Sequence, residues 1–167
     1  MRAKALLVRL MAFALAAGGA APAGAQPSDA AIKAAFITKF PAFVQGLPDG
    51  APLNVCIVGP DSFGSAIERS AAVRVVVRRL AVVTPTSGCH VVYATGGARQ
   101  SVRDALAIVA GAPVLTITDG GAGPTRGMIH FVVAGERVRF HVDTLQASRS
   151  HLQLSSKLLA LALSVRQ

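Results

Sequence analysis

Two histidines, His130 and His141, have a spacing that could place two imidazoles side by side. Two neighbouring imidazoles are a common part of a metal site. They lie on two runs of alternating apolar and polar residues joined through residues 134–137, and this pattern predicts an antiparallel hairpin. His151 or Asp143 could then supply a third ligand. The alternative is a pair of surface histidines at a sheet edge, which is the commoner arrangement, and the sequence assigns no metal ligand.

A glycine-rich segment, residues 119–127, follows the apolar run 114–118, which predicts a buried strand. Open α/β sheets bind ligands beyond the carboxyl ends of their strands, so this segment is the candidate ligand site. Asp119 offers an acceptor and Arg126 a forked donor, and these two are the candidate ligand-binding residues. A flexible connection without a ligand is the alternative.

Catalytic motifs are missing from the sequence. Residues 59–64 (GPDSFG) lack the Gly-Lys-Ser/Thr ending of a phosphate-binding loop and the spacing of a dinucleotide fingerprint. Asp61 or Ser62 is better explained as a cap in a strand-to-helix turn. The Ser-Ser-Lys run at 155–157 does not make an S-x-x-K motif. We therefore expect no enzyme activity, no catalytic residue and no cofactor.

The first part of the chain predicts export. Residues 1–25 have the features of a secretory signal peptide, with basic residues around a short apolar stretch at 6–17. Residues 23–25 form an A-x-A pattern that places cleavage before Gln26. We expect one periplasmic domain over residues 26–167, because a mature chain of this length can hold one ordinary core.

The chain is basic, with 17 Lys and Arg against 8 Asp and Glu and a formal charge of +9. An exported protein does not normally meet nucleic acid, and the basic residues are scattered with few aromatic residues between them. We therefore expect no nucleic-acid partner. A solvated basic surface is the simplest account, and phospholipid head groups, cell-wall polymer or an anionic protein face are alternatives.

The two cysteines, Cys56 and Cys89, most simply form one disulfide in an exported protein. Such a bridge would stabilise the fold by roughly 3 to 4 kcal/mol on the chain-entropy model. Two free thiols or a redox pair are the alternatives. The sequence favours the structural bridge, because it has no C-x-x-C spacing.

Helical and strand patterns alternate along the mature chain, which indicates the α/β class. We expect a single domain with a mixed, mostly parallel sheet, an antiparallel edge hairpin, helices on both faces and one disulfide. The expected elements are a helix capped by Ser28 or Asp29 and ended by Pro41, strands at 53–58, 73–83 (one or two strands), 91–94 and 114–118, a short helix ending near residue 70, and a helix at 101–110.

The hairpin pattern predicts a register as well as two strands. With Gly135 and Glu136 as a two-residue type II′ turn, partner numbers sum to 271, so Phe131 pairs with Phe140. The expected buried face holds Ile129, Phe131, Val133, Val138, Phe140 and Val142, and the opposite, outward face holds His130, Val132, Arg139 and His141.

The tail, residues 144–165, predicts one short helix followed by a second. Leu154, Leu158, Leu161 and Val165 would share one face of that second helix.

Six segments in a fixed order resemble a known family: AAIKAAFITKFPAFV, LNVCIVGPDSFG, CHVVYAT, PVLTITD, RGMIHFVVAGERVRFHVD and LQLSSKLLALA. Together they make residues 30–162 similar to the YfiR-like periplasmic repressors.

The resemblance implies an exported α/β domain, often dimeric, that restrains a membrane-bound diguanylate cyclase by contacting its periplasmic sensor. It also implies an outer-membrane-associated, YfiB-like partner that can sequester the repressor, and no enzyme activity. The alternative is a periplasmic small-ligand or cell-wall binding module that uses residues 119–127.

Overall fold

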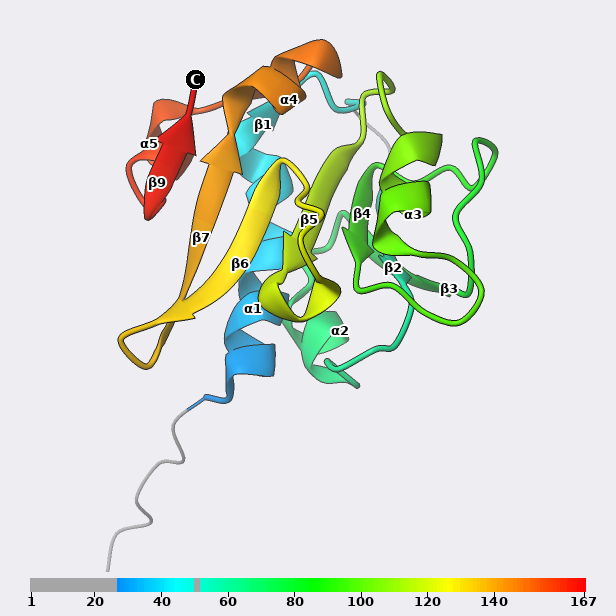
Figure 1. Ribbon diagram of the computed structural model, residues 1–167, viewed down its shortest axis with the longest axis horizontal. Coiled ribbons are helices and arrows are strands. Elements are labelled where there is room, and N and C mark those ends of the chain that lie inside the picture. The colour runs from blue at the N-terminus through cyan, green and yellow to red at the C-terminus, as the bar shows by residue number, and fades with distance from the viewer. Residues whose placement is uncertain (1–26, 50–51) are drawn as a thin grey trace, which may run out of the picture.

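The computed structural model describes residues 27–49 and 52–167, and the predicted signal peptide lies outside them. Helices and strands alternate along this part of the chain (Figure 1). The elements are α1 (Asp29–Lys39), the 3-10 helix η1 (Phe40–Phe43), β1 (Val44–Gln45), β2 (Leu53–Val58), α2 (Ala66–Ser70), β3 (Val75–Leu80), β4 (Val91–Ala94), α3 (Val102–Ile108), β5 (Leu115–Asp119), the 3-10 helix η2 (Gly120–Ala122), β6 (Ile129–Ala134), β7 (Arg137–Asp143), α4 (Thr144–Arg149), β8 (Gln153–Leu154), α5 (Ser156–Leu159) and β9 (Ser164–Arg166).

The described strands form one seven-stranded sheet in the order β3-β2-β4-β5-β6-β7-β9 and a small pair, β1 with β8. Within the large sheet, neighbouring strands run parallel except in the antiparallel β6–β7 hairpin. This is the single, mostly parallel α/β sheet that the sequence predicts. The short strand β9 pairs with the outer side of β7 and adds one strand beyond the hairpin.

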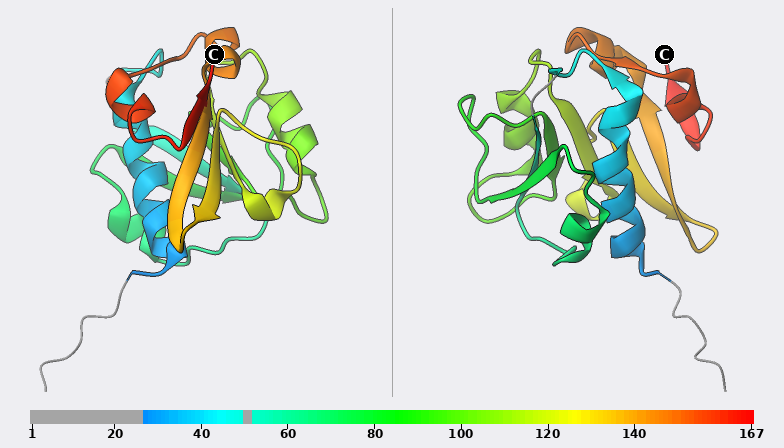
Figure 2. Two further views of the ribbon diagram at one scale, coloured as in Figure 1. Left: turned by 60° about the vertical axis from the view of Figure 1, so that its left-hand side comes forward. Right: turned by 180° about the vertical axis from the view of Figure 1, so that it is seen from behind.

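Helices cover both faces of the sheet, as expected, but they do not cover them equally (Figure 2). α1 and α2 lie on one face, over a large apolar cluster in which the rings of Phe36, Phe40, Phe131 and Phe140 have centroids 5.1 to 6.4 Å apart. α3 lies on the other face, over a smaller cluster around Cys56. The two clusters make β2 and β4 buried on both sides.

Helix α1 begins and ends where the sequence predicts. Ser28 is its N-cap, and the Ser28 Oγ accepts a hydrogen bond from the Ala31 backbone N–H at 3.2 Å. Pro41 has no backbone N–H, so the helix continues for one tighter turn as η1 and then ends. Ile37 and Phe40, on its buried side, are 0% and 2% exposed.

The hairpin has the predicted register, with Phe131 opposite Phe140. Both phenylalanines are buried, at 0% and 1% exposed. The turn is type I′ and not the expected type II′, because Gly135 and Glu136 both have positive φ, at 57° and 59°. Val133 was expected inside but is 57% exposed, although Val138 opposite it is buried, at 6% exposed.

The prediction of a second helix in the tail is wrong. The expected first helix is α4, but the chain then forms β8, the four-residue α5 and β9. Leu154 pairs with Val44, and Val165 pairs with Val142, so hydrogen bonds to distant strands replace those of a helix. Leu161, expected on the apolar face, is 58% exposed.

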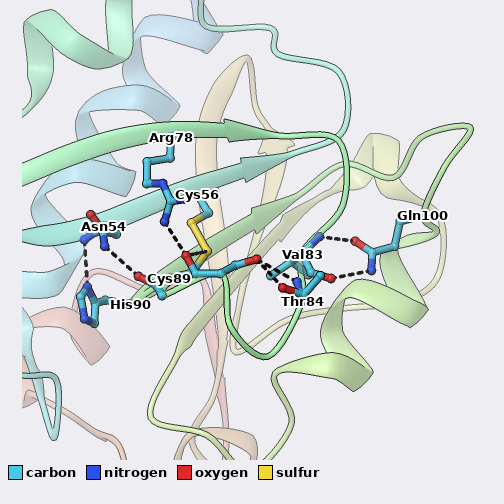
Figure 3. The surroundings of a disulfide bond; sticks show 10 residues. Asn54, Cys56, Arg78, Val83, Thr84, Cys89, His90 and Gln100 are labelled. Carbon is cyan, nitrogen blue, oxygen red and sulfur yellow. Dashed lines mark hydrogen bonds between the residues drawn. A yellow bond between two sulfur atoms is a disulfide. The ribbon is translucent and has the colours of Figure 1, made fainter.

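The Cys56–Cys89 disulfide is confirmed and joins β2 to the segment just before β4 (Figure 3). The two Cα atoms are 5.8 Å apart, and the cysteines are 0% and 8% exposed. Side chains of Asn54 and Arg78 donate hydrogen bonds to the backbone carbonyls of residues 87–88. The disulfide and these hydrogen bonds together hold the loop before β4 against the sheet.

Candidate functional site: a polar cleft on the open face of the hairpin

One part of the sheet has a face without a described helix over it. α1 packs behind β6 and β7, and α3 lies over the β2–β4 part of the opposite face, so the other face of the hairpin is open (Figure 1). A cavity of about 360 Å³ lies there. We call it the polar cleft, and its lining residues are Pro124, Arg126, Gly127, His130, His141, Val142, Asp143, Gln146, Ser164 and Arg166.

His130 lines the polar cleft but is buried, at 4% exposed, where the sequence predicted an outward-facing surface residue. That prediction is wrong because the β5–β6 connection folds back over β6. The Gly127 backbone N–H donates to the Thr118 Oγ1 at 2.9 Å, and Thr118 Oγ1 lies 2.8 Å from the His130 Nδ1. Burial lowers the pKa of His130, and the electrostatic effects of the nearby Arg126 and His141 lower it further, against the smaller opposing effect of Asp119. His130 is therefore neutral at pH 7.

His141 lies directly opposite His130, as the register predicts. It is partly exposed, and the His141 Nδ1 lies 2.6 Å from the Ser164 Oγ. Because Ser164 belongs to β9, the pairing of β9 with β7 brings a hydroxyl group to this histidine. The two imidazoles thus sit side by side with different surroundings, one buried and one open to solvent.

Two arginines give the polar cleft a positive charge. Arg126 is exposed, and its guanidinium has no hydrogen bond or ion pair with any residue in the described part of the chain. Arg166 is 75% exposed and forms an ion pair with Asp143, at 3.4 Å between Nη1 and Oδ2. The other carboxylate oxygen of Asp143 caps α4 by accepting the backbone N–H of Gln146 at 2.9 Å. Asp143 is thus occupied by structural contacts.

Asp119, the other candidate ligand-binding residue, faces the opposite side of the sheet. Its carboxylate accepts hydrogen bonds from the Tyr93 hydroxyl at 2.5 Å, the Lys33 Nζ at 3.3 Å and the Gly121 N–H at 3.0 Å. Burial alone would raise the pKa of Asp119, but the Tyr93 hydroxyl, the charged Lys33 and Gly121 together bring it below its usual value. Burial, followed by the contact with Asp119, raises the pKa of Tyr93.

The structure therefore does not bring Asp119 and Arg126 to one cavity. Arg126 lies in the polar cleft, whereas Asp119 fastens the end of β5 to α1 through Lys33. Ligand binding by either residue stays a prediction.

The histidines do not gather a third metal-ligating group in the described residues. Within residues 27–49 and 52–167, no three His, Cys, Asp or Glu side chains are placed to hold a metal ion. His151, one of the two third ligands considered, lies outside the lining of the polar cleft, in the turn after α4, where its φ is 58°.

A second, more apolar cavity of about 290 Å³ adjoins the polar cleft. Leu106, Val109 and Met128 supply its apolar walls, and Gln146 lines both cavities. The sequence analysis missed Gln146, although its position three residues after the cap Asp143 is typical of a helix start.

Ser164 and Arg166 of the polar cleft were also missed. They lie where the sequence predicted the end of a long helix, and they reach the polar cleft because β9 pairs with β7. No sequence motif marks that pairing.

The carboxyl ends of β2 and β4, a common place for ligands in α/β folds, are closed by backbone. A Cβ atom on Gly59 would lie 2.6 Å from the carbonyl oxygen of Gly96, so the two loops touch. In the loop after β2, the Asp61 carboxylate accepts the Phe63 N–H at 2.7 Å and pairs with Arg79 at 2.7 Å. This loop is a structural turn, as the sequence analysis expected.

Comparison with known proteins shows the family of the chain. The model of the YfiR/HmsC-like family matches residues 30–163, and no curated protein matches the chain. In the described residues, no helix has the length and apolar character needed to cross a membrane. Because the match covers most of the sequence, the chain belongs to the YfiR/HmsC-like family, a family of periplasmic regulators of cyclic-di-GMP signalling.

Proposed function

We propose that this protein binds the periplasmic sensor domain of a membrane-bound diguanylate cyclase and thereby lowers cyclic-di-GMP synthesis. The observation that carries the proposal is the family match over residues 30–163, which supports a periplasmic regulatory role in this signalling. The family is not an enzyme family, so the proposed role is binding without catalysis.

Such a role needs only a difference in binding between two conformations of the sensor. A difference of about 2.7 kcal/mol changes the ratio of active to inactive cyclase a hundredfold. At about 25 cal/mol per Å², burying an extra 110 Å² or so of apolar surface in one conformation supplies that energy. This is a small area compared with a typical protein interface.

The C-terminal edge of the sheet offers suitable apolar surface. Leu161 and Leu163, just before the outermost strand β9, are 58% and 45% exposed. At the other edge, Val73 is fully exposed, but the neighbouring strand β3 carries Arg78 and Arg79, and charged side chains on an edge strand oppose pairing. We therefore assign the sensor contact to the edge formed by Leu161, Leu163 and β9.

Export and the further partners belong to the same proposal. The predicted signal peptide, residues 1–25, would deliver the domain at residues 26–167 to the compartment of the sensor. A YfiB-like outer-membrane protein would relieve repression by sequestering the domain, and two copies of the chain would form a homodimer.

The test is a gene deletion complemented with variants, with cellular cyclic-di-GMP measured by mass spectrometry. Deletion should raise the nucleotide level, and the full-length gene should restore it. A version without residues 1–25 should fail to restore it, because the domain would stay on the wrong side of the membrane. Unchanged nucleotide in the deletion strain, with the cyclase expressed, would contradict the proposal.

Two matched variants test the assigned edge. Leu161→Asp places a charge in the proposed contact and should release repression and abolish capture of the cyclase from detergent-solubilised membranes. Val73→Asp places the same charge on a fully exposed site at the opposite edge and should leave both unchanged. The reverse result would move the contact to the β3 edge.

A further inference from the structure

His130 presents a hydrogen-bond donor to the polar cleft. The Thr118 Oγ1 accepts the N–H of Gly127 and lies 2.8 Å from the His130 Nδ1, and we assign the Thr118 hydroxyl as the donor to Nδ1. With Nδ1 accepting, the neutral ring carries its proton on Nε2. This assignment of the hydroxyl proton leaves the N–H on Nε2, the ring nitrogen that Thr118 does not contact.

The Nε2 of His130 has no partner within the described part of the protein. Among the described residues, every side-chain nitrogen or oxygen that is cut off from solvent has a hydrogen-bond partner. Because Nε2 has none, it is not cut off from solvent, and it opens onto the cleft that His130 lines. A histidine that is 4% exposed therefore directs an unused N–H into a cavity of about 360 Å³. No described residue uses this N–H, so it is available to a ligand in the cleft.

Three further donors line the same cavity. Arg126 has a guanidinium without a protein partner in the described residues, and Arg166 uses one N–H of its fork toward Asp143. The Thr116 hydroxyl donates to the Gln146 Oε1 at 3.5 Å, which turns the amide NH₂ of Gln146 away from Thr116.

The charge balance of the cleft is positive. Its one carboxylate among the described residues, Asp143, has both oxygens engaged, by the N-terminus of α4 and by Arg166. Against it stand two guanidinium groups, and His141 adds a second imidazole. An oxyanion requires hydrogen-bond donors that are not already paired, next to net positive charge. An arginine fork matches the two oxygens of a carboxylate or phosphate.

We propose that the polar cleft binds a small soluble oxyanion, through its carboxylate or phosphate group, between Arg126, Arg166 and the Nε2–H of His130. The cavity is large enough for a solute of several heavy atoms, and its enclosed His130 donor would be out of reach of a flat membrane surface. The proposal goes beyond sensor binding. Strand β9 borders both regions, because Ser164 and Arg166 line the cleft, but anion binding is measured on the protein alone, so the two proposals can fail separately.

The experiment is titration of the mature, disulfide-bonded protein with inorganic phosphate and, separately, with acetate at constant ionic strength. Binding is followed by calorimetry and by the ¹⁵N signals of the His130 ring. At least one of the two anions should bind and shift the Nε2 signal while the Nδ1 signal keeps its acceptor character. The anion that binds more tightly identifies the preferred group.

Matched variants assign the binding to the cleft. Arg126→Ala should weaken the binding of the preferred anion at least tenfold, because it removes an exposed fork without disturbing the core. Arg137→Ala removes the same charge from β7 outside the cleft and should change the affinity less than twofold. His130→Phe should also abolish binding, and Arg126→Ala keeps the test valid if that buried variant does not fold.

Two outcomes would overturn the proposal. One is an equal effect of the Arg126 and Arg137 substitutions, which would mean nonspecific attraction to a basic surface. The other is the absence of phosphate and acetate binding, including the case in which the protein cosediments with phosphatidylglycerol vesicles and the ligand is a lipid surface.

Discussion

Replacing both cysteines with alanine, in the double variant C56A/C89A, removes the covalent link between β2 and the segment before β4. The linked residues are 33 apart in sequence, and closing a loop of that length removes about 3.7 kcal/mol of chain entropy from the unfolded state at 25 °C. Loss of two buried sulfur atoms from the smaller apolar cluster should add about 1 kcal/mol. We expect a total loss of about 4 to 5 kcal/mol, which is a large fraction of the stability of a single domain.

Urea unfolding followed by circular dichroism measures this loss. The native spectrum should survive the substitution, because Asn54 and Arg78 still hold the loop through residues 87–88. Reduced wild-type protein is the control, because it loses the link but keeps both sulfur atoms, and it should lose the entropic part alone. Alanine is preferred to serine, since Cys56 is fully buried and a hydroxyl there would lack a partner.

A loss below about 1.5 kcal/mol in the double variant, with two-state unfolding intact, would refute this reasoning. It would mean that the unfolded chain already keeps the two strands close, so that the disulfide restricts little.

Three further predictions follow from the packing and the charges. Phe140→Ala should cost about 3 to 5 kcal/mol in urea unfolding because it opens a cavity among the rings of Phe36, Phe40 and Phe131, whereas Val133→Ala, at a 57% exposed site, should cost less than about 0.5 kcal/mol. Asp119→Asn should lower the free energy of unfolding by about 1.5 kcal/mol at pH 7. The folded state lowers the pKa of Asp119 below its ordinary 3.8, so this difference in stability should be constant above about pH 5 and disappear as the pH falls through the folded-state pKa. A difference that stays constant down to pH 2 would contradict the prediction. Asn-Gly is the preferred pair for a type I′ turn, so replacing Gly135-Glu136 by Asn-Gly should raise the melting temperature and increase the free energy of unfolding by about 1 kcal/mol. A lower melting temperature would show that Glu136 is not strained by its positive φ.

Local patterns predicted the sheet well because its strands are bounded by residues with strong local preferences. The strand at Leu53–Val58 lies between a proline and a glycine. The hairpin register follows from alternation together with the two-residue turn, since a slip of one residue would expose Phe131 and Phe140. The turn type was not predictable in the same way. Both type I′ and type II′ turns join strands with this register, and a glutamate in the left-handed region is uncommon enough to favour the wrong one.

The features that the sequence did not predict depend on contacts between distant segments. Leu154, Leu158 and Val165 have helical spacing and do pack against the core, but Leu154 does so from β8 and Val165 from β9. Pairing with β1 and β7 outweighs the local preference for a helix. His130 is similar, because alternation placed it on the correct face and only the fold of the β5–β6 connection makes that position buried.

The polar cleft is a consequence of how the helices are distributed. α1 is the longest described helix, and Phe36 of α1 and Phe40 of η1 pack on the hairpin from behind, while α3 lies over the disulfide-linked half of the sheet. The two-residue turn between β6 and β7 leaves no segment that could cross in front of them. Outward positions of the hairpin therefore carry polar residues, and where the β5–β6 connection and β9 close in from two sides, that polar surface becomes a cavity. Imidazole and guanidinium donors then line its wall, and the one carboxylate among the lining residues described is already occupied by Arg166 and the start of α4. The same arrangement that makes the hairpin stable on one side thus makes it receptive to an anion on the other.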